Sequence, residues 1–277
     1  MLTIDDHRRD RVGLLYVYPV ISRRAGGVSI GINLNPNNAC NWACVYCQVP
    51  DLKRGGPPAV DLALLETELR GFIGQVCAGD YLEREVPPEM RRLVDVAFSG
   101  NGEPTSADGF ADAVGCVERV LREFSLSDAL TVRLITNGSL MHRPAVREGI
   151  RRIGALRGEV WFKVDRASEA AVARINQVAF SLEKTQKALL QCAELADTWV
   201  QTCWFAMDGE EADETEQQAY LALLASLKDK VKGVHLYGLA RPSLQPEAPR
   251  LSALPPEYLR RFADRIETLG IRVTVSP

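Results

Sequence analysis

Short β-rich segments alternate with helical patterns along most of this 277-residue chain, and that alternation restricts the folds open to it. The seven expected strands span 28–34, 93–98, 130–135, 159–164, 198–205, 233–239 and 271–275. The clearest helical periodicity covers 61–76, with Asp61 as the expected N-cap. Alternation of this kind predicts a parallel sheet with right-handed crossovers.

Six strand–helix units and a terminal strand predict an α/β fold, a (β/α) barrel that is either a partial (β/α)6 core or complete. An open doubly wound sheet is the alternative. We expect one domain over 1–277, with an extension at 1–27, a barrel core at 28–242 and a C-terminal helix and strand at 243–277. In either architecture the chemistry gathers at the C-terminal ends of the strands, so the residues that follow each strand are the candidates.

Composition excludes some classes of protein. The chain is 46% hydrophobic and 25% charged, as is usual for a soluble globular protein. Its net charge of −3 argues against sequence-independent coating of nucleic acid. No apolar run approaches the roughly 20 residues that span a bilayer, and the N-terminal residues lack the apolar core of a signal peptide. We expect a cytoplasmic protein with no membrane partner.

Three of the seven cysteines, Cys40, Cys44 and Cys47, follow the first expected strand with the spacing Cys-x3-Cys-x2-Cys. In a reducing compartment such clustering indicates metal binding before disulfides. Soft thiolates suit iron–sulfur clusters, zinc and Cu(I). Structural zinc requires four ligands, and the other cysteines and histidines form no second close pair. A cluster held by three cysteines leaves one iron open to a chelating molecule, and Tyr46 is placed to cover one face of the site.

This loop, with an aromatic residue before its last cysteine, resembles that of the radical S-adenosylmethionine (SAM) superfamily. The resemblance implies a [4Fe–4S] cluster on Cys40, Cys44 and Cys47 whose open iron is chelated by the amino and carboxylate groups of SAM. It also implies reductive cleavage of SAM to a 5′-deoxyadenosyl radical that abstracts hydrogen from a substrate. An external electron donor of the flavodoxin or ferredoxin type is implied as a partner.

The segment after the second expected strand is similar to the Gly-Gly-Glu motif of that superfamily, which binds the methionine ammonium of SAM. Glycines let the backbone approach a ligand closely, and a carboxylate matches a cation. Asn101 stands where the motif has its second glycine, and the alternative reading is a turn with a helix cap. The expected cofactor-binding residues are Gly100, Asn101, Gly102, Glu103 and Pro104.

Later strand ends add further candidates. Thr136 and Asn137 are expected to contact SAM, although they also fit an ordinary turn. Lys163 lies within an apolar strand, where an ammonium needs a partner, and Asp165 shares its face two residues on. We expect Lys163 and Asp165 to be catalytic, with Lys163 on the SAM carboxylate or the substrate; the alternative is an ion pair that stabilises the rim. Arg241 follows the sixth strand and is expected on the same rim.

Several short segments narrow the resemblance to a group that includes the wyosine-type tRNA-modifying enzymes. They are 18–24, 31–34, 163–165, 174–176 and 236–242. The archaeal enzymes of that group carry a second cluster on N-terminal cysteines, whereas no cysteine precedes Cys40 here. We therefore expect a single cluster and leave the substrate unassigned.

RNA stays open as a substrate because basic residues surround the first of these segments. Such residues can contact phosphates, or they can be solvated and paired with acids. They are Arg8, Arg9, Arg11, Arg23, Arg24, Lys53 and Arg54. Two other classes also stay open: a zinc or iron–sulfur protein without radical chemistry, and an activase that places a radical on a partner protein.

Overall fold

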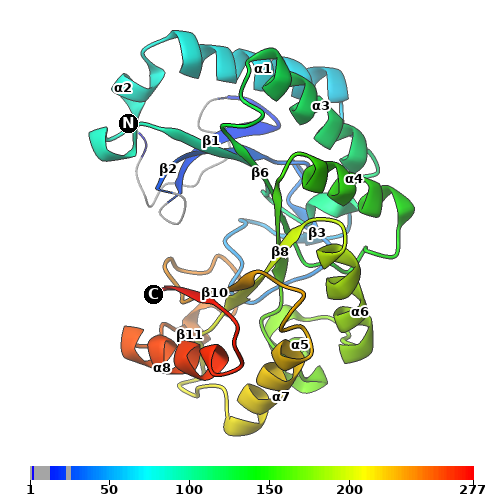
Figure 1. The fold of residues 1–277 in the computed structure, drawn as a ribbon. Helices are drawn as coiled ribbons and strands as arrows, with labels where there is room; N and C mark the ends of the chain where they lie inside the picture. The colour runs from blue at the N-terminus through cyan, green and yellow to red at the C-terminus, as the bar shows by residue number, and fades with distance from the viewer. Residues whose placement is uncertain (1, 3–12, 23–25) are drawn as a thin grey trace.

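The computed structural model describes residues 2, 13–22 and 26–277 and contains a curled eight-stranded sheet with helices along its outer face (Figure 1). In sheet order the strands are β1 (Val17–Ser22), β2 (Gly27–Ile32), β5 (Leu93–Phe98), β6 (Thr131–Thr136), β7 (Glu159–Lys163), β8 (Asp197–Cys203), β10 (Gly233–Tyr237) and β12 (Val273–Ser276). Two small sheets pair β3 (Ala39–Cys40) with β4 (Lys53–Arg54) and β9 (Ala206–Met207) with β11 (Leu251–Ser252).

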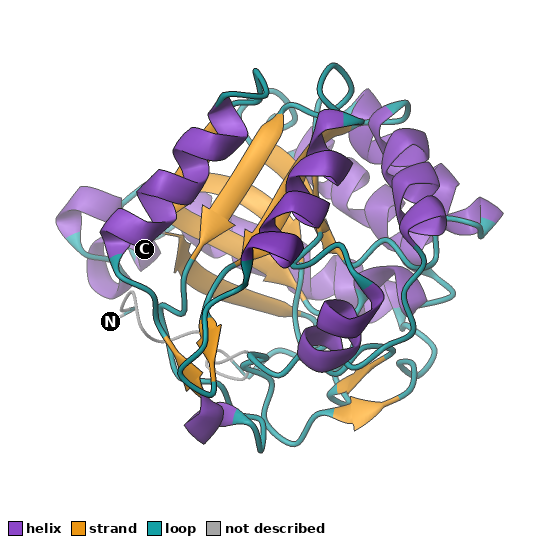
Figure 2. Ribbon diagram, turned by 90° about the horizontal axis from the view of Figure 1, so that it is seen from below, coloured by secondary structure: helices purple, strands orange, loops and turns teal. Residues whose placement is uncertain are grey.

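Helices connect the strands and surround the sheet, as the view from below shows (Figure 2). The α-helices are α1 (Leu62–Ala78), α2 (Tyr81–Glu85), α3 (Phe110–Glu123), α4 (Pro144–Ala155), α5 (Glu169–Asn176), α6 (Leu182–Ala193), α7 (Glu214–Ala225) and α8 (Pro256–Glu267). Three short 3₁₀ helices are η1 (Pro88–Met90), η2 (Pro104–Ser106) and η3 (Ala248–Arg250). None of the helices in the described residues is long and apolar enough to cross a membrane.

The order of the strands distinguishes the two predicted architectures. From β2 to β12 all neighbours are parallel, and they follow one another in chain order. A doubly wound sheet reverses its order at a switch point, and this sheet never does. The predicted partial (β/α) barrel is therefore confirmed, with six crossovers from β2 to β12.

The edge strand β1 was not predicted, because residues 1–27 were expected to form an extension. It pairs antiparallel with β2, and Pro19 lies opposite Ile30. Proline cannot donate a ladder hydrogen bond and is confined to edge strands, which explains both the missed strand and its position. On α1, the Glu68 carboxylate accepts hydrogen bonds from the backbone N–H groups of Leu15, Tyr16 and Val17, so it fixes the start of β1.

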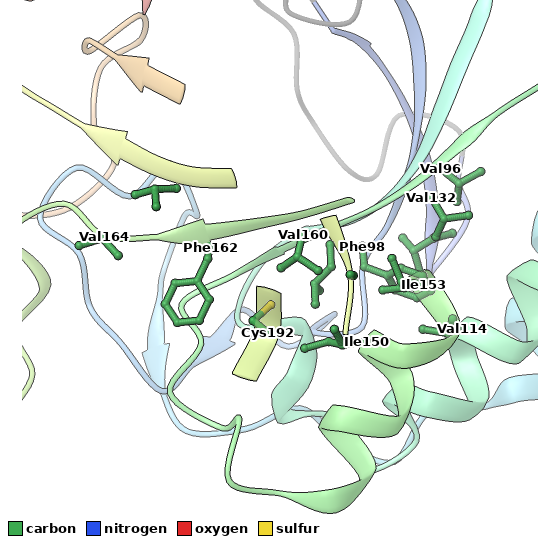
Figure 3. Close-up of a cluster of buried hydrophobic side chains, with 14 of the residues drawn as sticks. Val96, Phe98, Val114, Val132, Ile150, Ile153, Val160, Phe162, Val164 and Cys192 are labelled. Carbon is green, nitrogen blue, oxygen red and sulfur yellow. The ribbon is translucent and has the colours of Figure 1, made fainter. Parts of the chain in front are cut away.

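Alternating residues of each strand face opposite sides of the sheet. One side packs against the helices, and Figure 3 shows strand residues such as Val96, Val132 and Val160 near Ile150 and Ile153 of α4. The other side faces the inside of the half-barrel. Val96 of β5 and Val132 of β6 face the helices and are buried. Residues that alternate with them along the same two strands face the other side and line a cavity.

Candidate functional site

A cavity of about 560 Å³ occupies the inner side of the sheet and the loops at the C-terminal ends of its strands. The residues that line it come from both edges of the open barrel, Tyr18 on β1 and Ser276 on β12, and from the strands between them. Cys40, Cys44 and Cys47 all line it as well. The structure thus brings the three cysteines to the rim that strand–helix alternation predicted.

The three thiols of the loop are free and half-buried. Burial raises the pKa of Cys40 to about 11 and that of Cys44 to about 12. The backbone N–H of Trp42 lies 3.5 Å from the Cys40 sulfur and donates to it. With these raised pKa values, Cys40 and Cys44 are neutral thiols near pH 7 without a metal, and each must lose its proton to bind one.

The cysteine loop is anchored by the end of α5, more than 120 residues further along the chain. Val45 donates its N–H to the carbonyl of Ile175 at 2.9 Å, and Ala43 donates to that of Asn176 at 3.3 Å. The buried Asn176 side chain also donates to the Cys44 sulfur at 3.2 Å. The sequence indicated 174–176 only as a family resemblance, and no local pattern assigns Asn176 this contact.

Tyr46 and Lys163 belong to one buried polar network. The Tyr46 hydroxyl donates to Asp165 at 2.5 Å, and the Lys163 ammonium lies 4.9 Å from the centre of the Tyr46 ring. Lys163 donates to the Tyr237 hydroxyl at 3.2 Å and lies 4.0 Å from Asp165. Burial lowers the pKa of Lys163, but the neighbouring Asp165 carboxylate raises it, and with smaller contributions from Tyr237 and nearby cysteines the pKa is well above its ordinary value. Lys163 is therefore a cation at the wall of the cavity.

Asp165 lies behind that wall and is not among the residues that line the cavity. Its carboxylate accepts hydrogen bonds from Tyr46, from Asn176 at 2.8 Å and from the backbone N–H of Cys203 at 2.9 Å. The Lys163–Asp165 ion pair, which was the alternative to a catalytic role, is thus present, and Asp165 orients residues that do face the cavity. Its predicted catalytic role stays a prediction.

The Gly100–Glu103 loop packs directly on the loop that leads to the cysteines. A Cβ on Gly102 would lie 2.1 Å from the Ala39 carbonyl, and Gly100 has a φ of +138° with Asn33 against it. Only glycine satisfies both positions, because no side chain fits the contact and that backbone conformation strains other residues. Gly100, Gly102 and Glu103 line the cavity.

The buried Glu103 carboxylate joins the ends of β5 and β6. One oxygen accepts from the backbone N–H and hydroxyl of Thr105 and from the Thr136 hydroxyl, and the other accepts from the Asn137 N–H at 2.7 Å. Burial raises the pKa of Glu103 despite these donors. The Glu103 carboxylate thus accepts four hydrogen bonds, and these fix the loop after β5 against the loop after β6.

The remaining predicted residues have distinct places. Asn137 lines the cavity and donates to the Asn41 side chain of the cysteine loop at 2.8 Å. Arg241 also lines the cavity, and its carbonyl accepts from Gln48 at 3.3 Å. Asn101, Pro104 and Thr136 do not line the cavity. Asn101 donates to the Asn38 side chain at 2.7 Å, Thr136 donates to Glu103, and Pro104 begins η2.

The basic residues considered for RNA are only partly within the described part of the chain. Arg8, Arg9, Arg11, Arg23 and Arg24 lie outside the described residues. Arg54 is described, and its guanidinium donates to the carbonyls of two residues in the loops beside it, Asn41 and Gln177. Arg54 therefore braces the cysteine loop.

Sequence reasoning missed the deeper wall of the cavity. Asp95 and Arg133 form a buried ion pair there, and Arg133 also donates to Glu159 at 3.1 Å. Gln201, which is 5% exposed, lines the same wall with its side-chain oxygen lacking a hydrogen-bond partner in the described structure. The sequence could have indicated these residues, because each is a polar residue within an apolar strand, which is the criterion that singled out Lys163.

The donor set fits an iron–sulfur cluster. Three soft thiols on one loop line the same cavity and are otherwise covered by protein, which suits a cluster held by three cysteines. Within the part of the chain that the structure describes, no three His, Cys, Asp or Glu side chains gather closely enough to hold a single metal ion. Each ligand of one zinc ion would lie only about 2.0–2.3 Å from it.

Comparison with known proteins gives two curated relatives, and no protein-family model matches the chain. UPF0026 protein MJ1312 of Methanocaldococcus jannaschii is 31% identical over 160 residues, which is 57% of this chain and 43% of that protein. A protein named GTPase Obg from Brachyspira hyodysenteriae is 26% identical over 132 residues, 48% of this chain and 17% of that protein. The chain thus matches less than half the length of either relative.

Solved structures share the fold. A radical SAM methyltransferase from Sphaerobacter thermophilus has a TM-score of 0.61 at 15% identity, over 94% of this chain and 68% of that one. Coproporphyrinogen III oxidase from Escherichia coli, a radical SAM enzyme, has a TM-score of 0.50 at 12% identity, over 86% and 50%. Spore photoproduct lyase has a TM-score of 0.50 at 13% identity, over 79% and 58%. The chain has the partial-barrel fold of radical SAM enzymes, so the predicted fold is confirmed.

Proposed function

We propose that this protein is a radical SAM enzyme that binds one [4Fe–4S] cluster through Cys40, Cys44 and Cys47 and cleaves SAM reductively. Its substrate is still to be identified. One observation carries the proposal: three free thiols, the Glu103 loop and Lys163 line a single cavity in the fold of radical SAM enzymes. The family resemblance of the cysteine spacing supports the same conclusion.

The chemistry that such a cluster supplies when bound is one-electron cleavage of SAM to a 5′-deoxyadenosyl radical. The chain's own residues would bind and orient the cofactor. Lys163 offers a fixed ammonium for the SAM carboxylate, because Tyr237 and Asp165 hold it at the wall. The Gly100–Glu103 loop, which the Glu103 carboxylate holds in place beside the cavity, would contact the SAM ammonium.

Three other classes receive less support. A structural zinc protein requires four close ligands, and no second closely spaced pair of cysteines or histidines accompanies the Cys40–Cys47 loop in the sequence. The name GTPase Obg gives no basis for a nucleotide hydrolase, since the sequence contains no Gly-Lys pair and so lacks the Gly-x4-Gly-Lys-Ser/Thr phosphate loop. An activase role has no specific feature in its favour.

Several expectations belong to this proposal. We infer a single domain over 1–277, a reducing location such as the cytoplasm, which suits free thiols, and an external electron donor of the flavodoxin or ferredoxin type. RNA remains a candidate substrate, although Arg54, one of the basic residues considered for it, is used to brace the cysteine loop.

Anaerobic reconstitution tests the proposal. The protein, supplied with iron and sulfide and then with dithionite and SAM, is expected to bind about four irons and to form 5′-deoxyadenosine. The Cys44→Ala variant should lose both the iron and the product, because one cluster ligand is gone. Iron content by colorimetry and product by liquid chromatography measure the two outcomes.

The matched control is Cys77→Ala, since Cys77 is an exposed free cysteine that does not line the cavity. This variant should keep its iron and its product at wild-type levels. Wild-type protein that binds zinc, takes up no iron and leaves SAM intact would refute the proposal.

A further inference from the structure

A second cavity, of about 770 Å³, opens on the outer side of the cysteine loop. The residues that line it come from the start of α4 and the loop before it, the loop between α5 and α6, and the first three turns of α6. It shares two residues with the first cavity, Trp42 and Asn137. The cysteine loop therefore separates two cavities, and one side chain from it, Trp42, reaches both.

The charge of this second cavity is strongly one-sided. His142, Arg147, Lys184 and Lys187 line it, and among the described residues in its lining none carries a carboxylate. His142, Lys184 and Lys187 are exposed. This excess of positive charge occurs in a chain whose net charge is −3, so it is a local feature. A surface of one sign attracts partners of the other sign and speeds their association.

Trp42 connects this basic surface to the proposed cluster. It lies between Cys40 and Cys44 in the sequence, and its backbone N–H donates to the Cys40 sulfur. Its half-buried side chain lines the second cavity. A partner seated on the outer cavity would therefore lie against the cysteine loop without entering the first cavity, where SAM and substrate are proposed to bind.

We propose that the surface formed by Trp42, His142, Lys184 and Lys187 is the docking site of the protein that supplies the electron. The partner is an acidic one-electron carrier, a reduced flavoprotein of the flavodoxin class. Docking there brings its electron to the outer side of the cysteine loop and leaves the first cavity free. The inference rests on the proposed function, because only a cluster that must be reduced needs such a partner.

The step transfers one electron. The reduced flavin of the carrier loses this electron and is oxidised, and the cluster gains it and is reduced. No proton or group crosses the interface. The carrier leaves after each transfer, so a transient interface held by charge is expected.

The test reverses charge at two exposed positions, in the double variant Lys184→Glu/Lys187→Glu. Among the contacts of the described residues, Lys184 contributes its backbone N–H, which donates to the Ser181 side chain that caps α6 and which a substitution keeps. A glutamate at position 184, in the first turn of the helix, is favourable, and position 187 is exposed, so the variant should fold. Arg147 is left intact because it donates to the carbonyls of Met141 and His142.

The matched control is Lys228→Glu/Lys230→Glu, which makes the same charge change at exposed residues outside this lining. Formation of 5′-deoxyadenosine is measured twice for each protein, with reduced flavodoxin and with dithionite as the electron source. We expect the Lys184/Lys187 variant to lose about tenfold in kcat/KM for flavodoxin, the low end of electrostatic steering effects. Its dithionite-driven rate and both rates of the control should match the wild type.

Two results would overturn the inference. One is an unchanged flavodoxin-driven rate, and the other is an equal loss with both reductants, which would mean that the substitution damages the first cavity. If wild-type protein fails to cleave SAM even with dithionite, the proposed function fails. In that case calorimetry of oxidised flavodoxin binding to the wild type and to both variants tests the docking site, because binding can be measured without turnover.

Nucleic acid is the competing partner for a basic surface with aromatic side chains. Binding of tRNA by the wild type and by both variants separates the two. Loss of tRNA binding in the Lys184/Lys187 variant, together with unchanged flavodoxin binding, would assign the surface to RNA. Unchanged tRNA binding with weakened flavodoxin binding supports the electron carrier.

Discussion

Hydrogen bonds from distant residues hold the side chains around the cysteine loop in place. Asn176 donates to both the Cys44 sulfur and the Asp165 carboxylate, and Asp165 in turn accepts from Tyr46. Cys44 is thus contacted by a fixed N–H group that is itself oriented by a carboxylate. Partners of this kind tune the affinity and the reduction potential of a metal site.

We expect Asn176→Ala to shift the reduction potential of the reconstituted cluster to more negative values. An N–H group that donates to a ligand sulfur stabilises the reduced cluster, which carries more negative charge, and the variant lacks it. Affinity for the cluster should fall by about 10–100-fold, as is typical when such a partner is removed. Redox titration followed by electron paramagnetic resonance measures the potential.

The control for this prediction is Gln177→Ala. Gln177 is the exposed next residue, and its side chain bonds to Glu247 and not to a cysteine. This variant should keep the wild-type potential. An Asn176→Ala protein with an unchanged potential would show that the contact to Cys44 has no electronic effect.

At the scale of elements, α1 and α3 are joined by a group of ion pairs on the outer side of the barrel. Glu66 of α1 pairs with Arg119 of α3, and Arg70 of α1 pairs with both Glu66 and Glu123. Hydrogen bonds from Arg119 and Arg70 lower the pKa of Glu66 from 4.5 to about 2. Because these two helices follow successive strands, the pairs connect neighbouring strand–helix units.

The low pKa of Glu66 predicts how stability depends on pH. Its contribution is present above pH 4.5 and is lost as the pH falls through about 2, since the folded state holds the carboxylate ionised. Glu66→Gln should therefore lower the free energy of unfolding at pH 7 by about 1 kcal/mol or less, because the pairs are partly screened by solvent. The difference from the wild type should shrink as the pH approaches 2.

Urea unfolding at a series of pH values between 2 and 7 measures this difference. Glu118→Gln is the matched control, because Glu118 pairs with Arg122 inside α3 and joins no second helix. At pH 7 the control substitution should lower the free energy of unfolding by less than Glu66→Gln does. A Glu66→Gln difference that stays constant with pH would contradict the assignment.

At the scale of the whole molecule, the open barrel leaves its cavity between two sheet edges. Tyr18 on β1 and Ser276 on β12 both line the cavity, and those strands are not paired with each other. A ligand that filled the cavity would contact both edges and so help to hold the barrel together. Binding to the folded state alone stabilises a protein by mass action.

We expect SAM to raise the melting temperature of the cluster-loaded protein. At 100 times the dissociation constant the stabilisation is about 2.7 kcal/mol, which corresponds to roughly 5 °C for a chain of this size. Scanning fluorimetry under anaerobic conditions measures the shift. Cys44→Ala protein should show a much smaller shift, because SAM loses its proposed chelation to iron; equal shifts in both proteins would mean that SAM binds without the cluster.

The sequence was sufficient for the parts of the fold that local periodicity encodes. The strand at 93–98 was predicted with its observed bounds, and Asp61 caps α1 as expected, accepting from the Leu64 N–H. Alternation of strands and helices implied parallel pairing, because each crossover returns the chain to the same side of the sheet. The cysteine spacing is local too, so the candidate thiol site was visible before any tertiary contact.

Only the tertiary structure decided which residues meet. The contacts of Asn176 with Cys44 and of Glu103 with Asn137 join residues 132 and 34 positions apart, and no short-range pattern encodes them. The antiparallel strand β1 was hidden by Pro19, which is acceptable only because its strand lies at an edge. Lys163 ends β7 and lines the cavity, whereas Asp165 follows the strand and does not line it. The sequence determined which elements form and where the thiols lie; the packing of those elements decided what the thiols face, because contacts across a barrel depend on its curvature and not on local periodicity.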